Sequence, residues 1–232
     1  MTTALLGSRP TALVTGVSSG IGRAVAARLL DEGWTVTGVS RREPDLEAEG
    51  FSWIGADLGD PGAAHSISAG VGPLTAIVHA AGLLRSAPLG DLSSEDGEQM
   101  WRLHVDAPTR LVNALVSRLS DGGRIVLIGS RTMTGVAGKS QYAATKSALV
   151  GLTRSWAMEL SPRGITVNVV APGPTNTAML TDPGRATTPP RKPALGRFVE
   201  PAEVAGLTAF LLGPEGGSIT GQQLVICGGA SL

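Results

Sequence analysis

The amino-acid sequence places three side chains that can handle protons within a short stretch. Tyr142 is the only tyrosine in the chain, Lys146 follows it four residues later, and Ser130 precedes it by twelve. Residues four apart share a helix face, so the Lys146 ammonium should favour the phenolate of Tyr142, whose unperturbed pKa is roughly 10. A carbonyl that accepts hydride needs a proton donor and hydrogen bonds at its oxygen. Tyr142 is therefore a candidate proton donor and Ser130 a candidate for polarising the carbonyl, although a Tyr-x-x-x-Lys pair taken alone is more often an ordinary surface feature of a helix.

A glycine-rich turn follows the first β-prone run of the chain, residues 11–15. Gly16, Gly20 and Gly22 lack side chains, so the backbone there is able to turn sharply and approach a pyrophosphate. A helix expected over 21–31 would add free N–H groups and a partial positive charge. A plain strand-to-helix turn is the alternative, but the strand before the turn and the helix after it favour phosphate binding.

Short apolar runs alternate with longer helical segments, and these elements must position the residues named above. Strands are expected over 11–15, 35–39, 51–54, 76–78, 124–128, 166–170 and 224–226. Helices are expected over 21–31, 95–119, 141–160 and 201–212, the second of them bent or split at Pro108. This alternation predicts one α/β domain over residues 1–232, a doubly wound Rossmann fold with a mostly parallel sheet of seven strands.

One segment does not follow this alternation of strands and helices. Residues 178–196 contain four prolines and no clear period. A loop of that length inside a compact domain is typical of a lid, so we expect a substrate loop there. Its cationic residues Arg185, Arg191 and Lys192 are explained equally well by an anionic substrate or by a solvated loop.

Several motifs, in order, resemble the short-chain dehydrogenase/reductase family in its compact single-domain form. Residues 15–22 match the family's T-G-x-x-x-G-x-G turn, residues 79–82 its segment after the fourth strand, and residues 142–146 its active-site helix. Residues 168–173 and 219–222 match later signatures, so the resemblance covers almost the whole chain. It implies an oxidoreductase that uses a nicotinamide cofactor to interconvert a secondary alcohol and a ketone.

The resemblance also implies individual roles. In the family the tyrosine exchanges a proton with the substrate and the lysine also binds the nicotinamide ribose, roles that would fall here to Tyr142 and Lys146. A threonine in the position of Thr177 contacts the cofactor carboxamide, unless it only caps a helix. The expected cofactor-binding residues are Gly16, Ser18, Ser19, Gly20, Ile21, Gly22, Ser40, Arg41, Arg42, Asp57, Leu58, Ala80, Ala81, Gly82, Tyr142, Lys146, Pro172, Gly173, Thr175 and Thr177.

The end of the second expected strand bears on the choice between NADP and NAD. Enzymes that use NAD usually place an acidic residue there, whereas this chain has Ser40 followed by Arg41 and Arg42. An uncharged residue and two guanidiniums suit a 2′-phosphate through charge-assisted hydrogen bonds, which predicts NADP(H). NAD(H) remains the alternative if both arginines are merely solvated or if Glu43 neutralises one of them.

The sequence departs from the family pattern near the catalytic residues. Ser130 lies one residue closer to Tyr142 than is most common, and Thr132 and Thr134 are alternative hydroxyls beyond the expected strand end. His104 stands where the family has its fourth catalytic residue, an asparagine thought to hold a water that links the lysine to solvent. An imidazole donates, accepts and titrates near neutral pH, so His104 either keeps this relay with a changed pH profile or only fills space.

Composition limits the partners of the chain. It has nineteen basic and nineteen acidic residues, and this balance argues against nucleic acid or an anionic membrane as a partner. The lone Cys227 excludes an intramolecular disulfide, and His65, His79 and His104 lack metal-ligand spacing, so no metal is expected. Residues 1–9 do not resemble a signal peptide, and no apolar stretch approaches the ~20 residues that span a bilayer, so a cytoplasmic protein is expected.

Association with further copies of the chain is also expected. Helices 95–119 and 141–160 carry apolar residues that include Trp101, Leu149 and Trp156. In the family such faces pair between subunits, which implies a homodimer or a homotetramer.

Three other functions stay open at this point. An enoyl reductase of the same broad fold would typically space its tyrosine and lysine more widely. A methyltransferase with a glycine-rich turn would leave Tyr142 and Lys146 idle, and a catalytically silent nucleotide-sensing or scaffold relative is favoured if His104 breaks the relay. The substrate, its stereochemistry and the direction of the reaction are not encoded in any motif we recognise.

Overall fold

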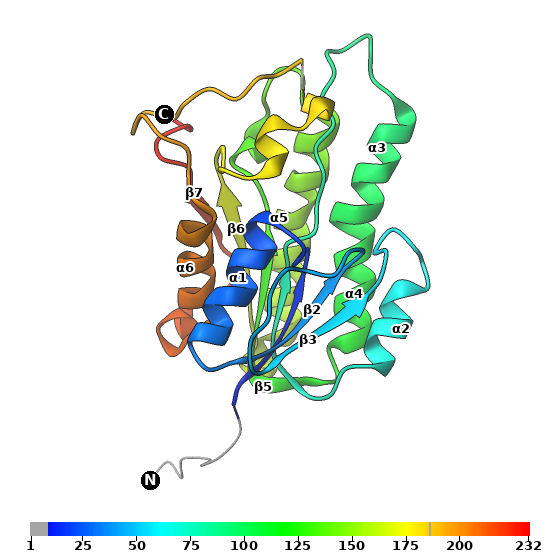
Figure 1. Ribbon diagram of the computed structural model, residues 1–232, viewed down its shortest axis with the longest axis vertical. Helices are drawn as coiled ribbons and strands as arrows, with labels where there is room; N and C mark the ends of the chain where they lie inside the picture. Colours follow the sequence, from blue (N-terminus) through cyan, green and yellow to red (C-terminus); the bar gives the residue numbers. More distant parts are fainter. Residues whose placement is uncertain (1–8, 186) are drawn as a thin grey trace.

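The computed structural model describes residues 9–185 and 187–232, which form one domain of helices packed on both faces of a parallel sheet (Figure 1). The seven strands lie in the order β3-β2-β1-β4-β5-β6-β7. The doubly wound Rossmann fold predicted from the alternating elements is therefore confirmed. The predicted domain limits of 1–232 include residues 1–8 and 186, which lie outside the described residues.

The strands and helices have the following bounds. The strands are β1 (Thr11–Thr15), β2 (Thr35–Ser40), β3 (Phe51–Gly55), β4 (Leu74–His79), β5 (Leu119–Ile128), β6 (Thr166–Pro172) and β7 (Gln223–Ile226). The α-helices are α1 (Gly20–Asp31), α2 (Ala63–Ala69), α3 (Ser94–Trp101), α4 (Ala107–Leu115), α5 (Ser140–Leu160) and α6 (Pro201–Leu212).

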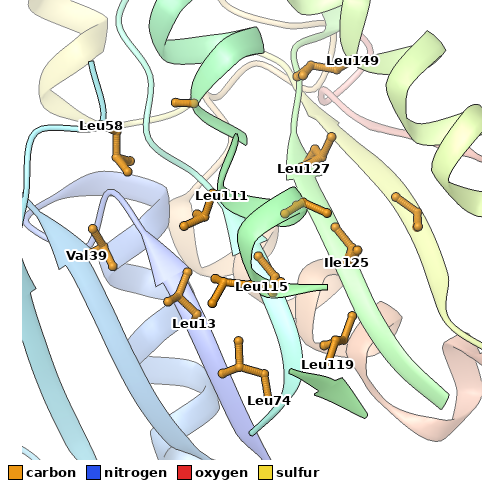
Figure 2. Close-up of a cluster of buried hydrophobic side chains, with 14 of the residues drawn as sticks. Leu13, Val39, Leu58, Leu74, Leu111, Leu115, Leu119, Ile125, Leu127 and Leu149 are labelled. Atoms are coloured by element: carbon orange, nitrogen blue, oxygen red, sulfur yellow. The ribbon is translucent and has the colours of Figure 1, made fainter. Parts of the chain in front are cut away.

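Alternate residues along the central strands enter two separate cores, one on either face of the sheet. Leu13 and Ile125 pack in one core with side chains of α2, α4 and α5 (Figure 2). Their chain neighbours Val14 and Val126 pack in the other core with side chains of α1 and α6. Because successive side chains of a strand point to opposite faces, a strand covered on both sides needs an unbroken apolar run. The sequence of β5 meets this demand from Ile125 to Ile128.

The winding of the chain reverses between β1 and β4. β1 pairs with β2 on one side and with β4 on the other, and the register of β1 and β4 places Thr15 opposite His79. In open α/β sheets, ligands bind beyond the carboxyl ends of the strands at such a reversal. The glycine-rich turn after β1 and the segment after β4 therefore border the same crevice.

The helix predicted over 95–119 is not continuous. It consists of α3 and α4, joined by a π-helical turn over Arg102–Asp106, and it ends before β5 begins. Pro108 has no N–H to donate into the preceding turn, which disrupts the regular helix. The carbonyl of Leu103 inside the turn instead accepts a hydrogen bond from His79 Nε2 at 3.1 Å. The break predicted at Pro108 is confirmed, whereas the predicted extent to residue 119 is wrong.

Two further elements differ from the sequence-based expectation. The short helix α2 was not expected, and β5 begins at Leu119 rather than at residue 124. Within the predicted substrate loop, 3₁₀ turns cover Ala178–Thr181 and Pro183–Arg185. Its other described residues, up to 196, form no helix or strand.

Candidate active site

A cleft of about 710 Å³ opens at the carboxyl ends of the central strands. Every residue predicted to bind cofactor or to act in catalysis lines this cleft, except His104. The fold therefore gathers the turn after β1, the segment after β4, the end of β5, the start of α5 and the segment after β6 around one space.

Gly16 and Gly22 let backbone segments pack closely around the turn that precedes α1. Gly16 has a φ of 76°, and a Cβ on it would lie 2.9 Å from the backbone nitrogen of Ala81. A Cβ on Gly22 would lie 2.4 Å from the carbonyl oxygen of Gly16. Helix α1 begins at Gly20, and the side chain of its N-cap residue Ser19 makes no capping hydrogen bond, which leaves first-turn N–H groups for a ligand. These features fit the pyrophosphate of a dinucleotide.

Ser40 shapes the turn after β2 rather than presenting its hydroxyl to the cleft. Its Oγ donates to the carbonyl of Arg42 over 2.6 Å and accepts from Trp53 Nε1 over 3.1 Å. Arg41 and Arg42 are exposed and line the cleft. Within residues 9–185 and 187–232 neither forms an ion pair, with Glu43 or with any other acid. Their guanidiniums are therefore free to bind an anion.

The segment after β4 is held by one hydroxyl. Thr15 Oγ1 accepts hydrogen bonds from the N–H groups of Ala80 and Ala81 at 3.0 and 3.1 Å. Its own proton is then left for His79 Nδ1 at 3.1 Å, so the His79 ring carries its proton on Nε2 and donates it to Leu103. Burial lowers the pKa of His79 to about 3, with the charge of Lys146 acting in the same direction. His79 is thus a packed, neutral histidine at the end of β4.

Tyr142 lies at the start of α5 with only 7% of its surface exposed. Its ring meets the edge of the His104 ring at right angles, with centroids 5.5 Å apart. Burial raises the pKa of Tyr142 above its usual value, while a hydrogen bond from Ser130 and the charge of Arg185 act in the opposite direction. The phenol is therefore protonated at neutral pH, and the Ser130 hydroxyl and the Arg185 guanidinium line the same cleft.

Lys146 is also buried, and its amine points into the fold. Its Nζ donates to the carbonyl of Ile128 at the end of β5 over 2.8 Å. Burial lowers the pKa of Lys146 to about 7, so a large part of its charge is lost near neutral pH, long before the phenol ionises. The predicted electrostatic effect of Lys146 on the Tyr142 phenolate stays a prediction.

Ser130 is positioned at the end of β5 by its neighbour Thr132. Ser130 Oγ accepts from the N–H of Thr132 at 3.2 Å and lies 2.9 Å from its hydroxyl. Both residues are buried and line the cleft, whereas the other alternative, Thr134, is exposed and lies away from it. The structure thus brings Ser130 to Tyr142 and keeps Thr132 as a partner of Ser130.

His104 is fully buried in the π-helical turn, behind the cleft wall. Its Nε2 accepts from the N–H of Leu83 at 3.1 Å, so the ring proton sits on Nδ1 and is donated to Thr145 Oγ1 at 2.9 Å. Thr145 in turn donates to the carbonyl of Tyr142 at 2.9 Å. Burial holds the pKa of His104 well below its ordinary value. The imidazole is therefore neutral at neutral pH and supports the turn of α5 that carries Tyr142.

The segment after β6 completes the cofactor side of the cleft. Thr175 Oγ1 donates to the carbonyl of Gly173 at 3.0 Å and is buried. Thr177 occupies the N-cap position of a 3₁₀ turn, but its side chain makes no capping bond there. A Cβ on Gly20 would lie 3.1 Å from the methyl group of Thr177, so this threonine packs directly against the glycine-rich turn.

Three cations at the other end of the cleft were missed or left undecided by sequence reasoning. Arg131, Lys139 and Arg185 all line it, and Arg185 is only 8% exposed. Arg191 and Lys192, which the sequence could not distinguish from Arg185, are exposed. Arg185 differs from Arg191 and Lys192 because its segment contacts the body of the domain. No local pattern in the sequence predicts those contacts.

Only some of the residues expected to pair with a second subunit are accessible at the surface. Leu149 is fully buried in the core of the domain, and Trp156 packs against that core. Trp101, by contrast, is 45% exposed.

Among the described residues, no group of three or more His, Cys, Asp or Glu is placed to hold a metal ion, and no helix is long and apolar enough to cross a membrane.

The amino-acid sequence is similar to that of several known proteins. The family model described as enoyl-(acyl carrier protein) reductase matches residues 16–231. The 3-oxoacyl-(acyl-carrier-protein) reductase FabG of Escherichia coli is 37% identical, over 94% of this chain and 96% of its own length. The cyclic-di-GMP-binding biofilm dispersal mediator protein of the same species is 34% identical, over 94% of this chain and 95% of its own length.

Solved structures agree with the sequence relatives. A short-chain dehydrogenase from Burkholderia cenocepacia in complex with NADP is 37% identical and superposes with a TM-score of 0.87, covering 96% of this chain and 98% of that one. A dehydrogenase/reductase from Sinorhizobium meliloti is 36% identical with a TM-score of 0.88, covering 97% and 96% of the two chains. The chain belongs to the short-chain dehydrogenase/reductase family of oxidoreductases.

Proposed function

We propose that this protein is an NADP(H)-dependent oxidoreductase that interconverts a secondary alcohol and a ketone, with Tyr142 as the general acid and base. The observation that carries the proposal is the position of the buried Tyr142 phenol. It lines the same cleft as the glycine-rich turn and Ser130. A proton donor is thereby placed where a carbonyl beside a nicotinamide ring would need one.

NADP(H), when bound, supplies or accepts the hydride. Tyr142 then donates the proton that neutralises the developing negative charge on the substrate oxygen, or removes that proton in the oxidative direction. Ser130 donates a hydrogen bond to the same oxygen, and the 2.9 Å contact with Thr132 keeps its hydroxyl in place. The raised pKa of Tyr142 suits the reductive direction, in which the phenol must be protonated before each turnover.

Lys146 has a positioning and binding role in this proposal. Its amine is fixed by the carbonyl of Ile128 at 2.8 Å, at the edge of the same cleft as the phenol. Ribose hydroxyls would give this amine further hydrogen-bond partners, and a phenolate on Tyr142 would favour its protonated form. The ammonium would then stabilise the phenolate during the reaction.

The preference for NADP(H) over NAD(H) rests on Arg41 and Arg42. Both line the cleft at the end of β2, both are exposed, and the described residues supply neither with an acidic partner. A 2′-phosphate would be bound by charge-assisted hydrogen bonds at this place. The structural relative solved in complex with NADP supports the same choice.

The substrate would enter between the turn after β5 and the loop that follows β6. The proposed substrate loop of residues 178–196 contributes Met179, Leu180 and Arg185 to the cleft wall. We further propose that the protein acts in the cytoplasm as a homodimer or homotetramer; exposed Trp101 on α3 is the described residue that best supports a subunit contact.

A screen of ketones and alcohols with NADPH and NADP⁺, followed by absorbance of the reduced nicotinamide, tests the proposal. Turnover of at least one carbonyl compound is expected, with NADPH favoured over NADH in kcat/KM. Binding of NADPH without turnover of any carbonyl or alcohol would instead favour a catalytically silent nucleotide-sensing protein. Fluorescence titration with NADPH against S-adenosylmethionine separates both from a methyltransferase.

A further inference from the structure

Arg185 is a buried guanidinium at the substrate end of the cleft. It is 8% exposed and lines the cleft together with Tyr142. Its Nη1 donates a long hydrogen bond of 3.4 Å to the carbonyl of Met179, while its Nε has no hydrogen-bond partner in the described part of the chain. A buried guanidinium without an acidic partner is costly, so a carboxylate that reaches it from the cleft would lower that cost.

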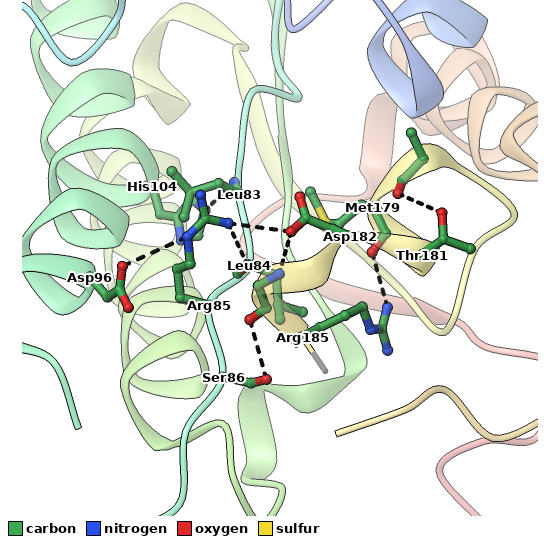
Figure 3. Close-up of polar contacts among 12 residues, drawn as sticks. Leu83, Leu84, Arg85, Ser86, Asp96, His104, Met179, Thr181, Asp182 and Arg185 are labelled. Atoms are coloured by element: carbon green, nitrogen blue, oxygen red, sulfur yellow. Dashed lines mark hydrogen bonds and ion pairs between the residues drawn. The ribbon is translucent and has the colours of Figure 1, made fainter. Parts of the chain in front are cut away.

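The segment that carries Arg185 is tied to the body of the domain. The hydroxyl of Ser86 donates to the carbonyl of Gly184 at 3.4 Å (Figure 3), and the N–H of Ser86 donates to the same oxygen at 2.9 Å. Arg85 lies between two carboxylates, with Asp96 Oδ1 at 3.7 Å and Asp182 Oδ1 at 3.6 Å. These contacts fix the turn before Arg185, so its guanidinium is a positioned group rather than part of a solvated loop.

The nearest carboxylate does not pair with Arg185. Asp182 has its Oδ1 shared between the ion pair with Arg85 and the N–H of Gly184, at 3.6 and 2.7 Å. Its charge does raise the pKa of Arg185, but burial lowers that pKa by more. No ion pair to Arg185 occurs in residues 9–185 and 187–232. The guanidinium thus keeps its charge and most of its donors for another partner.

Two more cations stand beside Arg185 without acidic partners among the described residues. Arg131 and Lys139 line the same cleft, and the Nε of Arg131 is likewise buried with no hydrogen-bond partner there. Lys139 is half-buried, and burial, followed by the charges of Arg185 and Arg131, lowers its pKa to about 8. The substrate end of the cleft is therefore strongly cationic, although the chain as a whole has no net charge.

We propose that the substrate is an oxo or hydroxy acid whose carboxylate is bound by Arg185 while Tyr142 serves the reacting oxygen. This substrate class rests on the proposed function of the site. A guanidinium presents paired donors that match a carboxylate, and one buried at the cleft wall holds that group in a fixed orientation. A neutral 3-oxoacyl thioester, such as the substrate class named for the FabG relatives, would leave Arg185 unpaired.

Matched pairs of substrates test the proposal. A panel of 2-, 3- and 4-oxo acids and their methyl esters is assayed with NADPH, together with 3-oxoacyl thioesters of N-acetylcysteamine. For the acid that is reduced best, the wild type should show a kcat/KM about 10- to 100-fold above that of its ester, the range expected for a hydrogen bond to a buried charge. Arg185→Gln should bring this acid-to-ester ratio close to one, and Arg185→Lys should give an intermediate ratio.

Arg191→Gln is the matched control, because Arg191 lies in the same loop but is exposed. It should keep the acid-to-ester ratio of the wild type. Thermal unfolding of each variant shows whether Arg185→Gln is folded, and Arg185→Lys supplies the second variant if it is not. Reduction of esters or thioesters as fast as the acids by the wild type, with no change of ratio in Arg185→Gln, would overturn the assignment and leave the oxidoreductase function intact.

Failure of the whole panel would count against the proposed function, and a binding measurement then decides the carboxylate site separately. With NADP⁺ present, malonate should raise the melting temperature of the wild type more than malonamide does, and Arg185→Gln should lose this difference. Equal effects of malonate and malonamide on the wild type would show that no carboxylate site exists.

Discussion

His104 donates a hydrogen bond from Nδ1 to the hydroxyl of Thr145 over 2.9 Å, and this hydroxyl donates a hydrogen bond to the carbonyl of Tyr142 over 2.9 Å. The bonds connect the π-helical turn to the first turn of α5. With both ring nitrogens engaged inside the protein, His104 has no free position for a titrating proton near pH 7. We therefore assign it a positioning role, where the family has its asparagine.

This assignment predicts the behaviour of two variants of His104. His104→Leu leaves the buried N–H of Leu83 without an acceptor and removes the donor to the Thr145 hydroxyl, so the free energy of unfolding should fall by about 1–3 kcal/mol. His104→Asn, which can donate and accept, should recover part of that loss. Urea unfolding of both variants measures the difference.

The pH–rate profile checks the same point independently of stability. Between pH 6 and 8 the profile of His104→Asn should have the shape of the wild-type profile, because burial keeps the pKa of His104 well below 6.5. An acid limb present in the wild type and absent from His104→Asn would mean that the imidazole exchanges a proton during turnover.

Buried neutral histidines also predict how stability changes in acid. The pKa of His79 is about 3 in the folded protein, against about 6.5 in an unfolded chain. Below pH 6.5 the unfolded state therefore binds one more proton at this site, and stability falls by about 1.4 kcal/mol per pH unit as the pH drops toward the folded pKa. His79→Asn should lack this part of the slope when urea unfolding is followed from pH 6.5 to 4.5.

His65 supplies the control for that experiment, because it is exposed at the surface of α2. His65→Asn should keep the wild-type dependence of unfolding free energy on pH. A slope that is the same in His79→Asn and in the wild type would contradict the burial of a neutral imidazole at the end of β4.

The parts of this molecule that were predictable depend on neighbours in the sequence. The turn around Gly16 and Gly22 lies between an apolar strand and an amphipathic helix, and Tyr142 and Lys146 are four residues apart on one helix. Such patterns are local, because a strand or a helix imposes its own period on the side chains it buries. They located the cofactor end of the cleft and the phenol at its centre.

The parts that were not predictable depend on contacts between distant residues. The π-helical turn lies where Pro108 provides no backbone N–H and where His79, at the end of strand β4, donates to the carbonyl of Leu103. Arg185 is buried because its segment is tied to Ser86, about a hundred residues earlier in the chain. The hydroxyl of Ser40 is engaged by Trp53 from β3. None of these partners can be paired from spacing alone.

The cofactor end of the cleft yields a separate prediction. The double variant Arg41→Ala, Arg42→Ala should lower kcat/KM with NADPH by about 10- to 100-fold, because charge-assisted hydrogen bonds to a phosphate are lost. The value with NADH, which has no 2′-phosphate, should change far less. Arg23→Ala on α1 is a control, since its side chain bonds to Asp45 and does not line the cleft. An equal loss with both cofactors would place the two arginines outside the 2′-phosphate site.

Turnover by Tyr142→Phe tests the central claim most directly, because this change removes one oxygen atom and keeps the ring that packs against His104. With NADPH and the best carbonyl substrate from the screen, kcat/KM should fall by roughly 10²- to 10⁴-fold, the usual contribution of a general acid. NADPH should still bind, as followed by its fluorescence. Turnover close to that of the wild type would contradict the account, because the proton would then come from another group.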